Sequence, residues 1–284
     1  MVIKITALYT SGALQIWVAV IVLFNVCGLG CVQAAPAISW SLAVGVQPIH
    51  YQELDTQGLT DDGILNSERG KLPSLSFGLR WQQSTVQLSP APSPWFAWSG
   101  SYAVGGSDYD GYLQTGQHLQ SYQSYTENVQ ISWKTKMGWT LPLELPSGQG
   151  YSGYLEPYVF YQQLGWEREL DQYTEHYHRR GHGIGLQWRQ DLTKDWQVLL
   201  SAARTLSGEA EVDVSGLGFE ATVDATWQQY DIGAYRRLNR QQMLGAVWRH
   251  SQYRSDASVI VNGYQSPSSQ EKRQALMLIF SCYF

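Results

Sequence analysis

Paired carboxylates are the first residues in the chain that could carry chemistry. Asp108 and Asp110 lie in the run Gly-Gly-Ser-Asp-Tyr-Asp-Gly. Two carboxylates this close can polarise a water molecule, but hydrolysis also needs a general base such as histidine. The alternative is an acidic loop base, because Asp and Gly both favour turns. On the residues alone, the turn-forming interpretation is preferred.

Histidines form the second group that could carry chemistry. His176, His178 and His182 would share one face of a strand, so a weak metal site is conceivable. The favoured alternative places them at a solvated rim, where His and Arg meet the phosphate groups of lipopolysaccharide. No zinc-ligand spacing, nucleophile elbow or phosphate-binding loop occurs elsewhere in the sequence, and no cofactor is predicted.

Composition limits the class of protein that could position these residues. The 284 residues include 12 Trp and 18 Tyr but only 15% charged residues, and the net charge is -5. This charge argues against a nucleic-acid partner, which would require clustered cations. Rings with an apolar body and a polar tip gather at membrane interfaces, so the aromatic excess is typical of a transmembrane barrel.

The amino-terminal residues 1–35 have the order of an export signal. Lys4 precedes an apolar stretch from about Leu14 to Gly30, and small residues follow at Ala34 and Ala35, after which cleavage is expected. An uncleaved anchor, or lipidation at Cys31, is the alternative. Cleavage leaves residues 36–284 as a single domain with one cysteine and hence no internal disulfide.

Period-two alternation is the main feature of residues 36–284. It gives strands with one apolar face and one small or polar face, as in a transmembrane barrel. The predicted strands cover residues 38–47, 73–82, 96–104, 128–139, 154–166, 177–189, 196–206, 222–237, 242–253 and 271–284. The fifth and ninth are apolar on both faces around Tyr158 and Leu244, which leaves their register open.

The connections between these strands alternate in length. Long polar segments are predicted at residues 51–71, 106–124, 167–176, 207–221 and 254–270. Shorter turns are predicted at residues 83–93, 141–153, 191–195 and 239–241. Bacterial barrels have short periplasmic turns and long extracellular loops, and an even strand count returns both ends to the periplasm.

Tryptophans gather near the predicted periplasmic ends of the strands, which suggests an aromatic girdle. The predicted girdle consists of Trp40, Trp81, Trp95, Trp98, Trp139, Trp188 and Trp196.

The last residues carry the most specific local motif. Leu276, Leu278, Phe280 and Phe284 alternate up to a terminal aromatic residue. This pattern resembles the insertion signal of Gram-negative outer-membrane proteins, which implies recognition by the barrel-assembly machinery. An ordinary buried last strand is the alternative.

Strand number, length and the position of the Asp108 and Asp110 pair are also similar to the omptins. That resemblance implies a ten-stranded outer-membrane barrel and an endopeptidase in which an Asp-x-Asp pair and an Asp-His pair activate water. The second pair is missing here, because residues 207–222 contain Glu209, Glu211 and Asp213 but no histidine. The resemblance therefore supports the architecture more than the activity.

Charged residues on the predicted inner faces bear on transport. Arg80, Lys134, Lys136, Arg189, Asp231 and Arg237 are expected there, and Glu156 and Glu167 are further candidates. Such groups should pair, because an unpaired charge away from water is costly. A narrow, largely filled interior is therefore expected, and a small pore is the alternative.

These features together predict an all-β protein, an antiparallel up-and-down transmembrane barrel of about ten strands, with 8 or 12 as alternatives. We expect a non-enzymatic protein of the bacterial outer membrane whose long loops make surface contacts or serve envelope structure. Its expected partners are outer-membrane lipid, lipopolysaccharide and the barrel-assembly machinery. The sequence leaves any surface ligand or host partner open, and an omptin-like protease or a small pore is the alternative function.

Overall fold

Strands form almost all of the structure, a computed structural model that describes residues 37–55, 57–83, 92–115, 118–143, 153–170, 173–215, 218–260 and 265–284. Contacts divide the chain into Met1–Ala35 and Pro36–Phe284. All described residues belong to the second unit, so the predicted export signal lies outside them. Among the described residues, no helix is long and apolar enough to cross a membrane.

Ten strands follow one another along the described chain. They are β1 (Ala37–Leu54), β2 (Ile64–Gln82), β3 (Ser93–Thr115), β4 (His118–Leu143), β5 (Gly153–Leu170), β6 (Tyr173–Asp191), β7 (Trp196–Val214), β8 (Phe219–Arg237), β9 (Gln242–Ser255) and β10 (Ser269–Tyr283).

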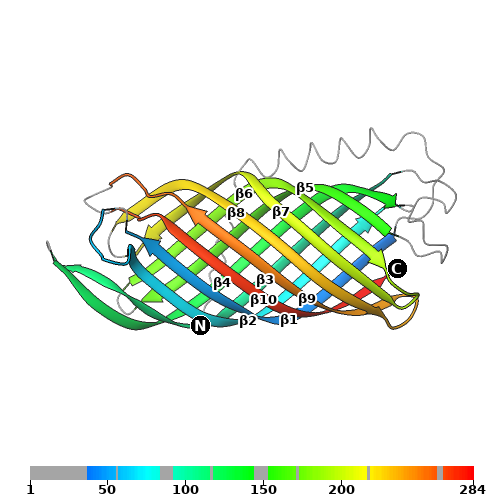
Figure 1. Ribbon diagram of the computed structural model, residues 1–284, viewed down its shortest axis with the longest axis horizontal. Coiled ribbons are helices and arrows are strands. Elements are labelled where there is room, and N and C mark those ends of the chain that lie inside the picture. The colour runs from blue at the N-terminus through cyan, green and yellow to red at the C-terminus, as the bar shows by residue number, and fades with distance from the viewer. Residues whose placement is uncertain are drawn as a thin grey trace. The chain divides into compact units, whose positions relative to one another are not determined.

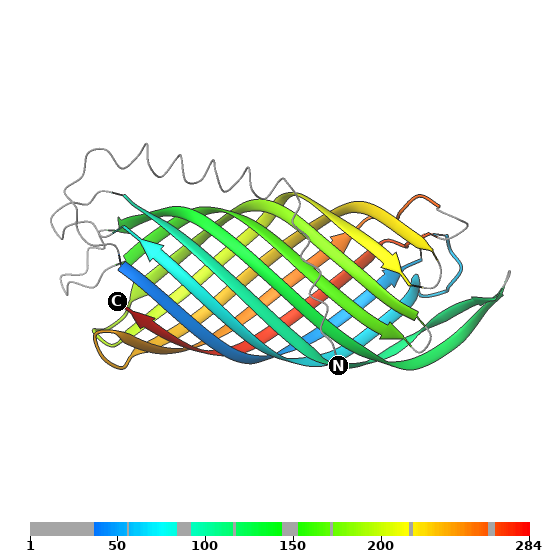
Figure 2. The same cartoon turned by 180° about the vertical axis from the view of Figure 1, so that it is seen from behind.

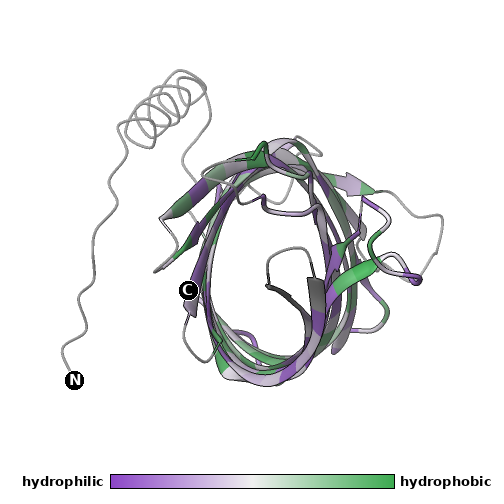
Figure 3. Ribbon diagram, turned by 90° about the vertical axis from the view of Figure 1, so that its left-hand side faces the viewer, coloured by the Kyte–Doolittle hydropathy of each residue, from purple (hydrophilic) through white to green (hydrophobic). Residues whose placement is uncertain are grey.

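Each strand pairs with its sequence neighbours, and β1 pairs with β10 to close the barrel. All pairings are antiparallel, and the closing register runs from Ser39 opposite Tyr283 to Glu53 opposite Ser269. The end-on view shows the strands joined in one ring (Figure 3). The predicted ten-stranded, up-and-down antiparallel barrel is confirmed.

The strands alternate between an apolar outer face and a small or polar inner face, because neighbouring side chains point to opposite sides of a sheet. On β1, Leu42, Val44 and Val46 are exposed on the outside, while Ala43 is buried. The same exposed apolar belt includes Leu75, Phe77, Leu79, Ile131, Val159, Ile184, Leu186, Leu200, Ile232, Leu244, Leu276 and Leu278. Such a belt is typical of a surface that faces lipid.

The structure assigns the two registers that the sequence left open. On β5, Tyr158 and Phe160 point into the barrel and Val159 points outward. On β9, Val247 is buried inside and Leu244 is exposed. In both strands, therefore, the apolar run has residues that face the belt and residues that pack inside the barrel.

The two ends of the barrel differ. The turn end holds the start of β1, the end of β10 and the tight turns at residues 192–195 and 238–241, closed by bonds such as Leu192 N–H to the carbonyl of Trp196 at 2.8 Å. The loop end holds the β3–β4 hairpin, which extends beyond the other strands (Figures 1 and 2).

Regular strand structure reaches much further toward the loop end than expected. Residues 106–124 were predicted as a long loop, but β3 and β4 remain paired there, with Gly111 opposite Tyr122. Residues 64–71 and 167–170 also belong to strands rather than loops. Polar residues on both faces conceal the alternation in these segments, because neither face there meets the lipid belt.

Candidate functional site in the barrel interior

A carboxylate with two guanidinium groups occupies the interior near the turn end. Glu156 of β5 is fully buried, pairs with Arg80 of β2 at 2.7 Å and also pairs with Arg189 of β6. Thr140 and Gln187 each donate a hydrogen bond to the same carboxylate at 2.8 Å. This is the pairing that a buried charge requires.

Trp95 also lies in this interior cluster, and its predicted place in the aromatic girdle was wrong. The side chain is 1% exposed, and the Arg80 guanidinium lies 4.3 Å from the centre of its ring. Trp95 and Trp98 differ by an odd number of positions, so they point to opposite faces of β3. Sequence distance from the strand end had placed both at one rim, although only Trp98 shares the outer face.

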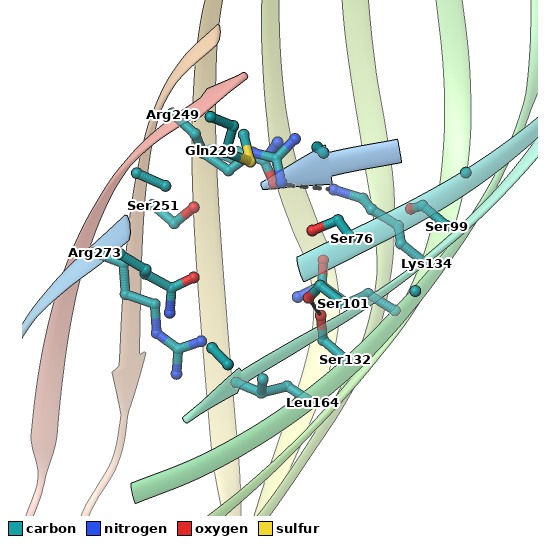
Figure 4. A pocket seen from close by; sticks show the side chains of 18 of the residues that line it. Ser76, Ser99, Ser101, Ser132, Lys134, Leu164, Gln229, Arg249, Ser251 and Arg273 are labelled. Carbon is teal, nitrogen blue, oxygen red and sulfur yellow. Dashed lines mark hydrogen bonds between the residues drawn. The ribbon is translucent and has the colours of Figure 1, made fainter. Parts of the chain in front are cut away.

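A polar cavity of about 180 Å³ lies in the middle of the barrel. Serines and glutamines line it from many strands, and Lys134 projects from β4 between them (Figure 4). The Lys134 Nζ donates a 3.3 Å hydrogen bond to Gln229 and lies 3.8 Å from the centre of the Trp227 ring. This position holds a cation by an amide oxygen and an aromatic face rather than by a carboxylate.

A second cavity of about 260 Å³ lies nearer the turn end. It shares Lys134, Lys136 and Arg249 with the first cavity, so the two adjoin. The Lys136 Nζ lies 4.8 Å from the centre of the Tyr158 ring, and Arg249 pairs with Asp231 at 2.8 Å. Water-sized space therefore extends from mid-barrel toward the turn end.

The interior of the loop end is closed by packed side chains. Leu72, Trp166 and Tyr51 are at most 2% exposed and belong to one buried cluster that also includes Ile49 and Val212. The Trp166 indole N–H donates to Asn128 at 2.6 Å, which fixes this large ring across the interior. The filled interior that the sequence predicted is present at this level.

Above this apolar layer, three carboxylates surround one arginine. The Arg168 guanidinium lies 2.8 Å from Glu68, 2.8 Å from Glu175 and 3.8 Å from Glu53. The cluster is beyond the apolar belt, because the outer face there begins with His50 and its cross-strand neighbours Arg69 and Lys272.

Two tyrosines connect the outer carboxylates of this cluster. Tyr51 donates to Glu53 at 2.9 Å, Tyr177 donates to Glu175 at 2.9 Å, and the two hydroxyl oxygens are 3.3 Å apart. Burial raises the pKa of the Glu53 carboxyl, and the neighbouring carboxylate of Glu175 raises it further. Glu53, Tyr51, Tyr177 and Glu175 thus form a row with three contacts between neighbours. The two tyrosine hydroxyls supply only two protons, so all three contacts are hydrogen bonds only if one carboxyl keeps its proton.

The predicted Asp108 and Asp110 pair is placed on the outside of the barrel. Both side chains are exposed, whereas Tyr109, which lies between them in the sequence, and the preceding Ser107 are buried inside. Their neighbours across the strand pair are Tyr125 and Gln123 of β4, respectively. The two carboxylates therefore face away from the interior clusters.

The predicted metal candidates His176, His178 and His182 also share the outer face, on β6. His176 Nδ1 lies 3.5 Å from the Glu167 carboxylate, which is exposed rather than inside as the sequence suggested. The described residues contain no group of three or more side chains placed to hold a metal ion. Of the histidines whose side chains the structure describes, none points into the barrel.

The remaining predicted aromatic and terminal residues lie on the outer face or at the turn end. Trp139 and Trp196 are about half exposed, Leu276 and Leu278 are 63% and 59% exposed, and Phe284 is 71% exposed. Trp40, Trp81, Trp98, Trp188 and Phe280 are partly exposed. Their roles as a periplasmic girdle and an insertion signal remain predictions.

Several interior residues escaped the sequence prediction. Glu53, Glu68, Arg168 and Glu175 lay in segments predicted as loops, so no face was assigned to them. The signal that could have found them is the continued alternation of β1, where Ile49, Tyr51 and Glu53 keep the parity of the inward-facing Ala43. Arg237 was expected inside but is exposed where β8 ends.

Comparisons with known proteins found similarity in structure but no match in sequence. No protein-family model and no curated protein sequence matches the chain. The outer-membrane protease OmpT from Escherichia coli has a similar structure, with a TM-score of 0.55, 9% identity, and coverage of 90% of this chain and 99% of that chain. The translocator domain of the autotransporter NalP from Neisseria meningitidis has a TM-score of 0.37 at 9% identity, with 96% of each chain covered.

Sequence identity this low shows a shared fold but not a shared activity. The closed ten-stranded barrel and its likeness to OmpT together identify the fold. The chain has the fold of a ten-stranded outer-membrane β-barrel of the Gram-negative type.

Proposed function

We propose that this protein is a non-enzymatic outer-membrane barrel that makes surface contacts through its loop end. The observation that carries the proposal is the protruding β3–β4 hairpin above an interior closed by Trp166 and Leu72. A closed interior disfavours transport across the barrel, whereas a projecting hairpin suits contact with another surface. Export through the signal at residues 1–35, insertion by the barrel-assembly machinery and contact with lipopolysaccharide belong to the same proposal.

The outer face of the hairpin has the composition of a contact surface. Asp108, Asp110 and Tyr112 follow one another on the outside of β3, and Tyr125 lies opposite Asp108 on β4. Tyr125 is 62% exposed and Tyr112 is 38% exposed. Tyrosine offers a rigid amphipathic contact at low entropic cost, and the carboxylates favour a partner with cations.

The same geometry speaks against an omptin-like site. Water activation between two pairs requires that the pairs face each other across a gap. Asp108 and Asp110 instead face outward, and no histidine with a described side chain points into the barrel. We therefore assign these carboxylates to recognition rather than to hydrolysis.

Adhesion of bacterial cells that display the protein tests the contact function. Cells with the wild-type chain should be retained on surfaces coated with basic proteins, and a variant with Asp108→Asn, Asp110→Asn and Tyr125→Ser should lose most of this retention. The matched control is Glu220→Gln on β8, an exposed carboxylate outside the hairpin. Equal retention of all three kinds of cell would contradict the proposal.

Peptide cleavage tests the absence of enzymatic activity. Purified, folded protein with added lipopolysaccharide should not cleave a library of basic and acidic peptides. Cleavage that Asp108→Ala abolishes would replace the proposal with a protease.

A further inference from the structure

We propose that the two adjoining cavities inside the barrel form a binding pocket for a small oxyanion of the sulfate or phosphate class. The pocket is distinct from the loop-end surface and does not depend on the function proposed for that surface.

The lining of the two cavities is positively charged. Arg80, Lys134, Lys136, Arg189, Arg249 and Arg273 line one or both cavities, and none of the described lining residues is Asp or Glu. The carboxylates that neutralise the arginines stand back from the cavities. Glu156 pairs with Arg80 and Arg189, Asp231 pairs with Arg249, and Glu271 pairs with Arg273. The walls therefore present cations to the enclosed space.

Two of these cations lack a carboxylate partner. Across the described strands, neither Lys134 nor Lys136 takes part in an ion pair with Asp or Glu. Lys134 is only 8% exposed and has an amide oxygen and two aromatic faces as its contacts. Asp231 attracts both lysines from beyond ion-pair distance, but it is itself paired with Arg249. A buried ammonium group without a carboxylate of its own is costly, and a bound anion would supply that charge.

Neutral donors complete the pocket. Gln130 is 3% exposed, and its Oε1 accepts a 2.8 Å hydrogen bond from Gln47, but its Nε2 has no partner among the described groups. Ser101 and Ser132 share one hydrogen bond at 2.7 Å, which leaves one of the two hydroxyl protons available. Figure 4 shows these serines and Lys134 on one wall, opposite Arg249 and Arg273. Donors on opposite walls suit a tetrahedral anion, which accepts hydrogen bonds in several directions.

Size and access agree with this ligand. Each cavity, at about 180 and 260 Å³, far exceeds the ~10–15 Å³ that one water molecule needs. The second cavity reaches residues at the turn end, such as Ser39 and Tyr283, whereas the packed layer of Leu72 and Trp166 closes the loop end. The pocket is therefore blind, and free anions reach it from the turn end.

Titration calorimetry of the folded full-length barrel in a neutral detergent tests the pocket, with sodium sulfate as the probe. Measurements at about pH 6, well below the ordinary lysine pKa, and at constant ionic strength isolate the specific site. Wild type should bind sulfate saturably at one site. Lys134→Met and Lys136→Met should each weaken binding about tenfold or more, because each removes a charge-assisted hydrogen bond.

Matched controls separate the pocket from general charge effects and from misfolding. Lys71→Met and Lys272→Met remove exposed cations from the outer face and should leave the affinity unchanged. Heat-modifiable migration reports folding of every variant, and Lys134→Arg keeps the charge and should keep binding. Sulfate should also change tryptophan emission in wild type but not in Trp227→Phe, because Trp227 contacts Lys134.

Three outcomes would overturn the proposal. They are no saturable binding to wild type, equal affinity in the wild type and the two Lys→Met variants, or equal loss in the outer-face controls.

Discussion

At the scale of single residues, the barrel interior contains buried charged side chains whose cost of burial is offset by nearby ion-pair and hydrogen-bond partners. Glu156 has two arginines and two further hydrogen-bond donors, whereas Arg168 is surrounded by three carboxylates. The first arrangement holds excess positive charge, and the second holds excess negative charge. The two clusters should therefore respond differently to pH and to mutation.

Glu53→Gln should reduce the pH dependence of stability. Because burial and Glu175 raise the pKa of Glu53 above its unfolded value, the folded state holds this proton at a pH where the unfolded state has lost it. The contribution of Glu53 is most favourable below the unfolded pKa and declines as pH rises through the folded pKa. The glutamine variant should therefore gain stability over wild type toward neutral pH.

Urea unfolding of the detergent-solubilised barrel between about pH 4 and pH 8 measures this difference. Glu169→Gln, an exposed change on β5, serves as the control and should follow the wild-type profile. A stability difference between wild type and Glu53→Gln that stays constant with pH would show that Glu53 ionises normally.

Glu156→Gln should be strongly destabilising. The substitution keeps the shape of the side chain but leaves Arg80 and Arg189 without a counter-charge inside the barrel. Loss of one partner of a buried ion pair costs about 3–5 kcal/mol. The midpoint of urea unfolding should fall accordingly, while the exposed Glu220→Gln should leave it in place; similar midpoints for both variants would mean that the two guanidinium groups find solvent instead.

At the scale of elements, small residues on one strand make room for large residues on the next. Tyr158 and Phe160 of β5 point inward, and Gly183 and Gly185 of β6 lie beside them. A Cβ at Gly183 would lie 2.1 Å from the carbonyl oxygen of Arg204 and 2.6 Å from the Phe160 ring. Gly183 also borders the register shift between β6 and β7, so this position must stay small.

Gly183→Ala should therefore destabilise the barrel. The new methyl group would meet the backbone of β7, which cannot rotate away as a side chain could, and overpacking of this kind costs about 1–3 kcal/mol. Gly165→Ala on β5 is the matched control, because no atom comes closer than 3.8 Å to its Cβ. Thermal unfolding in detergent should separate the two variants, and coincident transitions would contradict the steric argument.

Element boundaries also show what the sequence could predict. Where one face meets the lipid belt, as around Leu42 and Ile232, alternation predicted both the strand and its orientation. Beyond the belt, as around Glu53 and Arg168, the outer face is mostly polar and the inner face mixes apolar with charged side chains, so hydrophobicity alone could not reveal the strand. The carboxylate partners of the interior arginines depend on pairings across the barrel, such as Arg179 of β6 with Glu271 of β10, which no local pattern encodes.

At the scale of the whole molecule, closure and filling combine to determine what can pass through. Ten strands close without an edge, so every route across the membrane lies inside the barrel. The middle and the turn end contain polar space, but Leu72 and Trp166 are nearly inaccessible at the level above. The barrel should therefore admit small solutes from one end without conducting them to the other.

Planar-bilayer recording of the purified protein tests this closure. Wild type should give no discrete conductance steps, because ions would have to pass a layer of packed apolar and aromatic side chains. Leu72→Ala combined with Trp166→Ala should open the layer and give steps, with a preference for anions set by Lys134 and Lys136 below it. Steps in the wild-type recordings would show that the layer opens in the membrane, and a silent double variant that still migrates as a folded barrel would place the barrier elsewhere.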